Sequence, residues 1–290
     1  MKVRGHNVFW SGTSFIPEWV KSLKKKEALL VHEKRAREVV TRYKGRLVDW
    51  DFCNETLNGN HWEMRVMGDD IHAKMTRWVK EQDPECRVCM NEFGVLSSEG
   101  KCRRYIEKVK AILKQGGVID ALGCQGHYHG EDFNRTTLKR CLDMLGELNL
   151  PILITEFNMP GQKSKYRGNH KGKLSPDEEK RKAVAVRDYL RISFQHPSVE
   201  AFIFWGAWEP HLWIPASALW KSDMSPTPAL KEYRKLVFEK WWTKWEGKAD
   251  EKGECRLTPF FGRHRIRSGG KELAVELVKG KGAEQHRVAL

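Results

Sequence analysis

Short apolar segments alternate with longer amphipathic segments along this chain, and this alternation limits the folds it can adopt more than any other feature. Six segments have the apolar, β-rich pattern of strands, at residues 3–10, 46–53, 87–92, 118–127, 151–157 and 199–206. Helical periodicity is found at 27–44, 69–82, 101–115, 136–148, 176–194 and 228–242. A strand, a helix and another strand repeated in this way predict a parallel sheet with right-handed crossovers. The predicted fold class is therefore α/β, with about six β/α units.

The size of the chain fits one large α/β unit. It has 290 residues and a net charge of +14. The basic residues are spread through the helical segments with glutamates among them, which predicts a solvated surface and no nucleic-acid partner. A basic surface would also suit an acidic polysaccharide. No apolar run reaches the ~18 residues that a membrane span needs, and the residues after Met1 do not form a secretory leader, so we expect no membrane partner.

The seven cysteines are an odd set, so at least one is unpaired within the chain. Cys86 and Cys89 have the two-residue gap of a metal or redox pair. In a strand this odd offset sends the two side chains to opposite faces, and no second pair completes a zinc site. Buried apolar cysteines are the better interpretation, and we predict neither a metal nor a cofactor.

The pattern changes near the C-terminus. Residues 256–266 and 272–278 have strand character with no helix between them. We therefore predict two domains, an α/β domain over residues 1–248, which the resemblance described below identifies as a catalytic barrel, and a small β-rich extension over 249–290. The extension is expected to be partial.

Two glutamates directly follow strand-like segments. Glu55 closes the segment that begins near Leu47, and Glu156 closes the one that begins at Pro151. The carboxyl ends of parallel strands meet at one edge of a sheet, where α/β barrels carry out their chemistry. A paired-carboxylate site is the first hypothesis. The alternative is that both are solvent-exposed loop acids.

Five sequence blocks together resemble the successive strand-end motifs of the glycoside hydrolase family 10 endo-xylanases. They are RGHNVFW at 4–10, DWDFCNE at 49–55, ALGCQGH at 121–127, ITEF at 154–157 and FIFWG at 202–206. The resemblance implies a (β/α)8 barrel of the TIM type. In that family the RGH block belongs to the third strand, so the first two strands are expected to be missing. We therefore expect a fragment or a truncated gene model rather than a minimal barrel, and the activity of this chain alone is an open question.

The resemblance also implies the chemistry, which is retaining, endo-acting hydrolysis of the β-1,4-xylan backbone by an endo-1,4-β-xylanase. Glu156 would be the nucleophile and Glu55 the acid/base. In such enzymes the two carboxyl groups lie about 5 to 5.5 Å apart. The substrate-binding residues implied are His6, Trp10, Asn54, Gln125, His127, Trp205 and Trp213. For His127, a core histidine satisfied by a backbone carbonyl is the alternative.

Some features depart from the family pattern. Ser11 stands where the family usually has a second histidine, and residues 207–210 replace the usual Thr-Asp after the last strand. These loops shape subsites, so cleavage of mannan or glucan by the same type of barrel stays an alternative. A polysaccharide-binding protein without turnover is a second alternative. We expect a monomer with a polysaccharide substrate, located outside the cytoplasm.

Overall fold

The computed structural model describes residues 2–57, 61–130, 133–161 and 174–278, and the chain forms two compact units. The first unit is Met1–Leu230 and the second is Lys231–Leu290. The first unit contains a parallel sheet with the order β1-β3-β4-β5-β6-β7, in which β2 also pairs with β3. Its strands are β1 (Arg4–Gly5), β2 (Phe9–Trp10), β3 (Asp49–Asn54), β4 (Arg87–Glu92), β5 (Ala121–Cys124), β6 (Ile152–Phe157) and β7 (Val199–Phe204).

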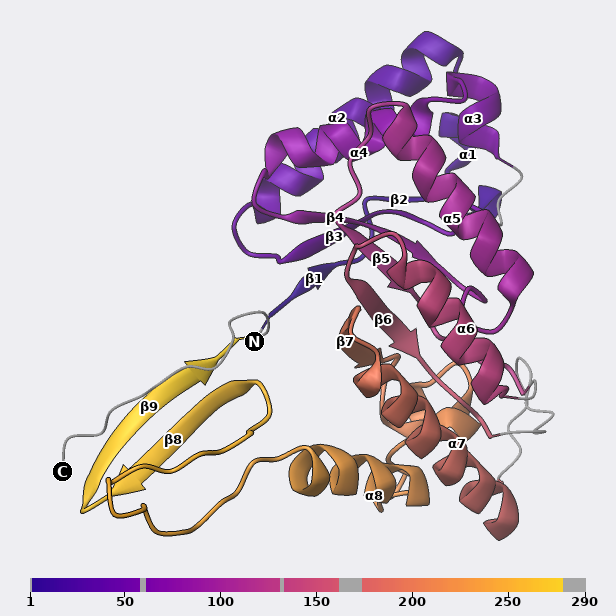
Figure 1. Ribbon diagram of the computed structural model, residues 1–290. Coiled ribbons are helices and arrows are strands. Elements are labelled where there is room, and N and C mark those ends of the chain that lie inside the picture. The colour runs from indigo at the N-terminus through magenta and orange to yellow at the C-terminus, as the bar shows by residue number, and fades with distance from the viewer. Residues whose placement is uncertain (1, 58–60, 131–132, 162–173, 279–290) are drawn as a thin grey trace. The chain divides into compact units, whose positions relative to one another are not determined.

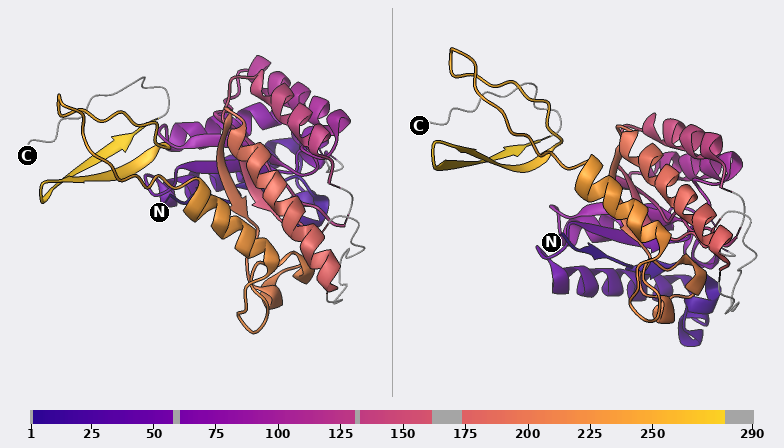
Figure 2. Two further views of the ribbon diagram at one scale, coloured as in Figure 1. Left: turned by 60° about the horizontal axis from the view of Figure 1, so that its bottom comes forward. Right: turned by 90° about the horizontal axis from the view of Figure 1, so that it is seen from below.

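Helices follow the strands and cover the outer face of this curved sheet (Figures 1 and 2). They are α1 (Glu18–Lys21), α2 (Lys25–Tyr43), α3 (Trp62–Met67), α4 (Ile71–Gln82), α5 (Glu99–Lys114), α6 (Arg135–Gly146) and α7 (Pro176–Gln195), while α8 (Pro228–Lys235) crosses the boundary between the units. Consecutive long helices from α4 to α7 pack on one another. The predicted α/β class is confirmed: β1 and β2 both pair with β3 and share one strand position, so the described sheet is the six-strand part of a (β/α)8 barrel.

The predicted strand over 3–10 is wrong in one respect, because it is broken into β1 and β2. Gly5 pairs with Trp50, and Phe9 pairs with Cys53. Four residue steps on the first segment therefore face three steps on β3. The extra residue cannot enter the ladder, so the segment bulges at His6 and Asn7.

Other boundaries also differ from the predictions. The strand predicted over 118–127 is limited to β5, and Gly126 just beyond it has a left-handed φ of +79°, outside the extended range of regular strands. The helix predicted over 228–242 ends at Lys235 and continues as a π-helical turn over Leu236–Lys240. The short helices α1 and α3 were not predicted, because they are too brief to show periodicity.

The central strands are buried on both faces, as expected for a parallel sheet covered by helices. Every residue of β3, β5 and β6 is buried. Cys89, Ala121 and Leu153 form a buried row across β4, β5 and β6, with Ala201 of β7 packed against it. Strand β7 contains only intermediate and exposed residues, so the sheet is less covered there. Cys86 and Cys89 are both buried free thiols, which agrees with their interpretation as apolar core residues.

The second unit contains an antiparallel hairpin of β8 (Gly262–Ser268) and β9 (Lys271–Leu277). It confirms the small β-rich region near the C-terminus, although the first predicted strand begins at Gly262 rather than at 256. Arg267 lies opposite Glu272 and pairs with it at 2.8 Å. The domain boundary at 248/249 stays a prediction. Within the described part of the chain, the helices lack the combination of length and apolarity that crossing a bilayer requires.

Candidate active site

The ends of β3 and β6 bring the two predicted carboxylates into one hydrogen-bonded network. Gln125 Nε2 donates to Glu55 Oε1 at 3.3 Å and to Asn54 Oδ1 at 3.0 Å. Asn91 Nδ2 donates to the same Asn54 oxygen at 3.0 Å and to Glu156 Oε1 at 2.6 Å. Three amide side chains therefore connect Glu55 to Glu156. Glu156 is 5% exposed, so its carboxylate depends on these donors for solvation.

The position of Asn91 is determined by its neighbours. Thr155 Oγ1 donates to Asn91 Oδ1 at 2.7 Å, and this leaves the Nδ2 group to face Asn54 and Glu156. Asn91 lies beside Gly123 in the sheet register. A Cβ atom at Gly123 would lie 2.8 Å from Asn91 Oδ1, so the missing side chain makes room for the amide. Asn91 is thus a rigid donor to the predicted nucleophile.

His127 contacts the second oxygen of Glu156, with Nε2 at 3.1 Å from Oε2. Its Nδ1 contacts Oδ1 of Asn158. Because Asn158 Nδ2 donates to the Tyr128 carbonyl at 3.1 Å, the Asn158 oxygen must face His127, so we assign a hydrogen to Nδ1. The contact between Nε2 and Oε2 is then a hydrogen bond only when one further proton lies between imidazole and carboxylate. The backbone-satisfied alternative for His127 is wrong, since both ring nitrogens face side chains.

His6 lies on the other flank of Glu156. Its Nδ1 is 2.9 Å from Asp51 Oδ2 and 3.9 Å from Glu156 Oε1. Burial acts to lower the pKa of His6, but the hydrogen bond to Asp51 and the charges of Asp51 and Glu156 outweigh it and raise this pKa above 6.5. Arg4 also binds Asp51, at 2.7 Å, and so holds the carboxylate in place. A cationic ring beside the predicted nucleophile is favoured by this arrangement.

Aromatic rings surround the two histidines. The Trp205 ring lies 5.6 Å from His6 and 6.1 Å from His127. Trp213 lies 5.2 Å from His127, and Trp10 lies 6.4 Å from His6. Trp205 and Trp213 remain 39% and 45% exposed. Exposed indole faces beside buried carboxylates provide the mixed apolar and polar surface that binds sugar rings.

All nine residues predicted for the site are therefore brought together by the fold, while their individual roles stay predictions. Sequence reasoning left Asp51, Asn158 and Thr155 out of the site. Asp51 lies inside the block at 49–55, four positions before Glu55, and Asn158 directly follows the block at 154–157, two positions after Glu156, so proximity to these motifs was the available signal. Asn91, at the end of β4, was also left out of the predicted site residues.

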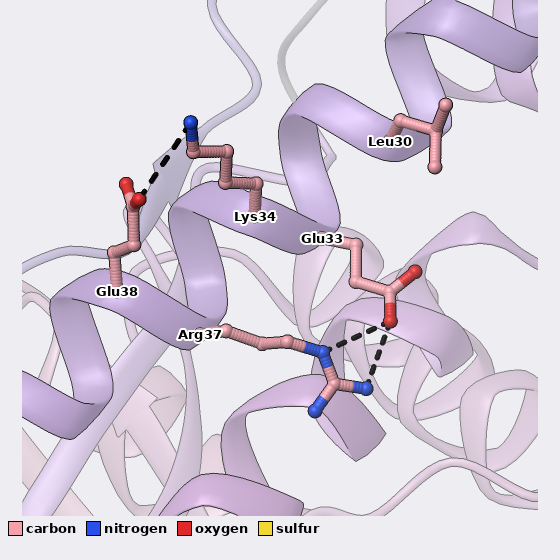
Figure 3. A pocket seen from close by; sticks show the side chains of 5 residues that line it. All are labelled: Leu30, Glu33, Lys34, Arg37 and Glu38. Carbon is pink, nitrogen blue, oxygen red and sulfur yellow. Dashed lines mark hydrogen bonds and ion pairs between the residues drawn. The ribbon is translucent and has the colours of Figure 1, made fainter.

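A separate pocket lies on the outer surface of α2, with a volume of about 340 Å³. Figure 3 shows that its charged side chains pair with one another, Arg37 with Glu33 at 2.8 Å and Lys34 with Glu38 at 3.8 Å. None of the predicted site residues lines it. For metals, the described ranges contain no group of three or more His, Cys, Asp or Glu side chains that could hold an ion.

A barrel sheet with two carboxylates and a set of indole rings at its carboxyl edge defines the class of the barrel glycosidases. The comparison with family models agrees with this class. The model of glycosyl hydrolase family 10 matches residues 1–236, and the chain belongs to this family.

The relatives of the chain include an anti-sigma factor as well as xylanases. The chain is 32% identical over 268 residues to the anti-sigma-I factor RsgI6 of Acetivibrio thermocellus, which covers 92% of this chain and 32% of that protein. It is 27% identical over 254 residues to endo-1,4-beta-xylanase B of Thermotoga neapolitana, covering 83% of this chain and 70% of the enzyme. It spans about a third (34%) of endo-1,4-beta-xylanase 5-like of Arabidopsis thaliana, to which it is 30% identical over 212 residues.

Solved structures share the fold. Xylanase 10B of Thermotoga petrophila, determined in complex with xylobiose, superposes with a TM-score of 0.72 at 24% identity. The match covers 83% of this chain and 75% of that enzyme.

Proposed function

We propose that the protein is an endo-acting, retaining β-1,4-xylan hydrolase with Glu156 as nucleophile and Glu55 as acid/base. The observation that carries this proposal is the amide network that joins the two carboxylates through Gln125, Asn54 and Asn91. Supporting it are the match to glycosyl hydrolase family 10 and the similarity to xylanase B of Thermotoga neapolitana.

In this mechanism the Glu156 carboxylate attacks the anomeric carbon while the Glu55 carboxyl protonates the leaving oxygen. Asn91 donates to Oε1 of Glu156 and the His127 ring lies against Oε2, and these two contacts orient the carboxylate for attack. Water then hydrolyses the glycosyl ester, and Glu55 acts as base in this second step. No metal or cofactor takes part in these steps.

Asn54 would stabilise the charge that develops on the sugar. Its Oδ1 accepts hydrogen bonds from Asn91 and from Gln125. The Nδ2 group lies 3.5 Å from Glu55 Oε1 and retains a hydrogen for a sugar hydroxyl. A bond to the 2-hydroxyl that strengthens in the transition state contributes to catalysis rather than to ground-state binding.

The test compares Glu156→Ala and Glu55→Ala with a control, Glu200→Gln. Glu200 pairs with Arg87 at 2.9 Å, outside the carboxylate network, so its loss should leave turnover unchanged. Glu156→Ala should lower reducing-sugar release from xylan by roughly 10³-fold or more. Added azide should then yield a glycosyl azide of inverted configuration. A modest loss in Glu156→Ala would contradict the assignment of the nucleophile.

The same assay separates the alternatives. Faster release from mannan or β-glucan than from xylan would assign another substrate of the same barrel type. Retention on xylan without any release would assign a binding protein. The monomeric state stays a prediction, which gel filtration tests. The extracytoplasmic location also stays a prediction; it is favoured because a polymer substrate does not enter cells, and cell fractionation tests it.

A further inference from the structure

The backbone of Glu55 adopts an unusual conformation. Its φ is +60°, in the left-handed region that residues with a Cβ seldom occupy. Such a conformation costs on the order of 1 to 3 kcal/mol and persists only when its surroundings hold it. Identifying what holds residues 55–57 therefore identifies what aims the Glu55 carboxyl.

The end of β4 supplies the contacts. The Glu55 N–H donates to the Asn91 carbonyl at 2.9 Å. Two residues further on, the Leu57 N–H donates to Glu92 Oε2 at 2.9 Å. Glu92 is fully buried, and its other oxygen, Oε1, accepts the Phe93 N–H at 3.1 Å. The turn that carries Glu55 is thus tied to β4 on both sides.

Glu92 is itself held firmly. Lys101 Nζ on α5 lies 3.7 Å from Glu92 Oε1 and 3.2 Å from the centre of the Phe93 ring. The Glu92 carbonyl accepts the backbone N–H of Gln125 at 3.0 Å, and the side-chain amide of this same Gln125 contacts Glu55. The carboxylate therefore connects the Glu55 turn with β5 and α5.

A buried carboxylate at position 92 lowers the stability of the fold. Burial raises the pKa of Glu92 to about 7, and the charge of Glu55 adds to this effect, while the Leu57 N–H and Lys101 oppose it. Well-packed apolar residues usually stabilise a fold as well as a buried ion pair does. The use of a carboxylate at this position is better explained by the two N–H groups that it orders.

We propose that Glu92 is a positioning residue for the general acid. Its carboxylate holds the turn at residues 55–57, in which Glu55 has its left-handed φ, and so directs Glu55 at the leaving oxygen. The positioning stands on geometry alone, whereas its consequence for catalysis rests on the proposed function. The test therefore has one arm that needs no turnover and one that measures it.

The first arm follows amide hydrogen exchange at Leu57 and Phe93. Glu92→Leu removes both acceptor oxygens, so both amides should exchange at least about 10-fold faster. Glu92→Gln, which preserves shape, should accelerate at least one of them, because an amide has a single acceptor oxygen. The matched control is Asp120→Asn. Asp120 Oδ2 likewise accepts a backbone N–H of β4, from Val88 at 2.9 Å, and a lysine, Lys80, at 3.0 Å.

The control should leave exchange at Leu57 and Phe93 unchanged. Unchanged exchange at Leu57 and Phe93 in both Glu92 variants would overturn the proposal. This result can be obtained whether or not the protein cleaves any polysaccharide. If the wild-type protein hydrolysed no β-glycan, the proposed function would be wrong. The exchange measurement would still decide whether Glu92 positions residues 55–57.

The second arm measures leaving-group dependence. In Glu92→Gln, kcat on xylan should fall about 10- to 100-fold with little change in KM, because a misdirected acid protonates a basic leaving oxygen poorly. Hydrolysis of a dinitrophenyl xylobioside should fall less than about 3-fold, since its leaving group needs no proton. Equal losses on both substrates would mean that Glu92 acts only on stability, and would overturn the positioning role. Asp120→Asn should show the wild-type ratio.

Discussion

The buried carboxyl of Glu63 should make the stability of the protein depend on pH. Glu63 lies on α3 and is 2% exposed, and its Oε2 has no hydrogen-bond partner among the described residues. Burial raises its pKa from 4.5 to about 7. Hydrogen bonds from its own backbone and from Ser11 act to lower this pKa, as do the charges of Lys108 and Arg65, but burial outweighs them. Glu63→Gln keeps the shape of the side chain and removes its titration.

The sign and size of the effect follow from linkage. Because the folded-state pKa lies above the unfolded value, the folded protein holds the proton more tightly, and the stabilisation is complete below the unfolded pKa. It is lost as the pH rises from 4.5 to about 7. A pKa difference of this size corresponds to roughly 3 kcal/mol. The contribution of Glu63 to the free energy of unfolding should therefore fall by about that amount across this range and stay level above it.

Urea unfolding followed by circular dichroism between pH 4 and pH 8 measures this free energy. The difference between wild type and Glu63→Gln isolates Glu63 from Glu92, whose pKa is also raised to about 7. A Glu18→Gln control, at a side chain that is 87% exposed, should follow the wild-type curve. Parallel curves for wild type and Glu63→Gln would refute the raised pKa of this buried carboxyl.

Two further substitutions test how the site is built. Gly123→Ala should displace the Asn91 amide, because the new Cβ would lie 2.8 Å from its oxygen. Glu156 would then lose its donor, and kcat on xylan should fall at least about 10-fold. An unchanged kcat would show that the amide is not a rigid donor. Lys182→Met should raise KM several-fold and lower the melting temperature. The buried Nζ of Lys182 donates to the carbonyls of Ala216 and Ala218 at 3.0 and 3.2 Å, shortly after Trp213 in the chain. Lys180→Met, at a side chain that is 75% exposed, should change neither quantity.

Local patterns in the chain were sufficient to predict the architecture and both carboxylates. Strand and helix periodicities depend on neighbouring residues, so the order of β3 to β7 and the helices between them could be predicted from the printed sequence. Glu55 and Glu156 could be placed because each directly follows an apolar strand, and parallel strands bring their carboxyl ends to one edge.

Contacts between strands could not be predicted in this way. Whether Asn91 faces Glu156 depends on the register of β4 against β5 and on the space left by Gly123, and no local pattern contains that register. The bulge at His6, which faces Asp51, arises because four residue steps oppose three on β3. The positions of strand ends are local information, whereas hydrogen-bond partners far apart in the sequence are chosen only when the strands pair and the side chains pack.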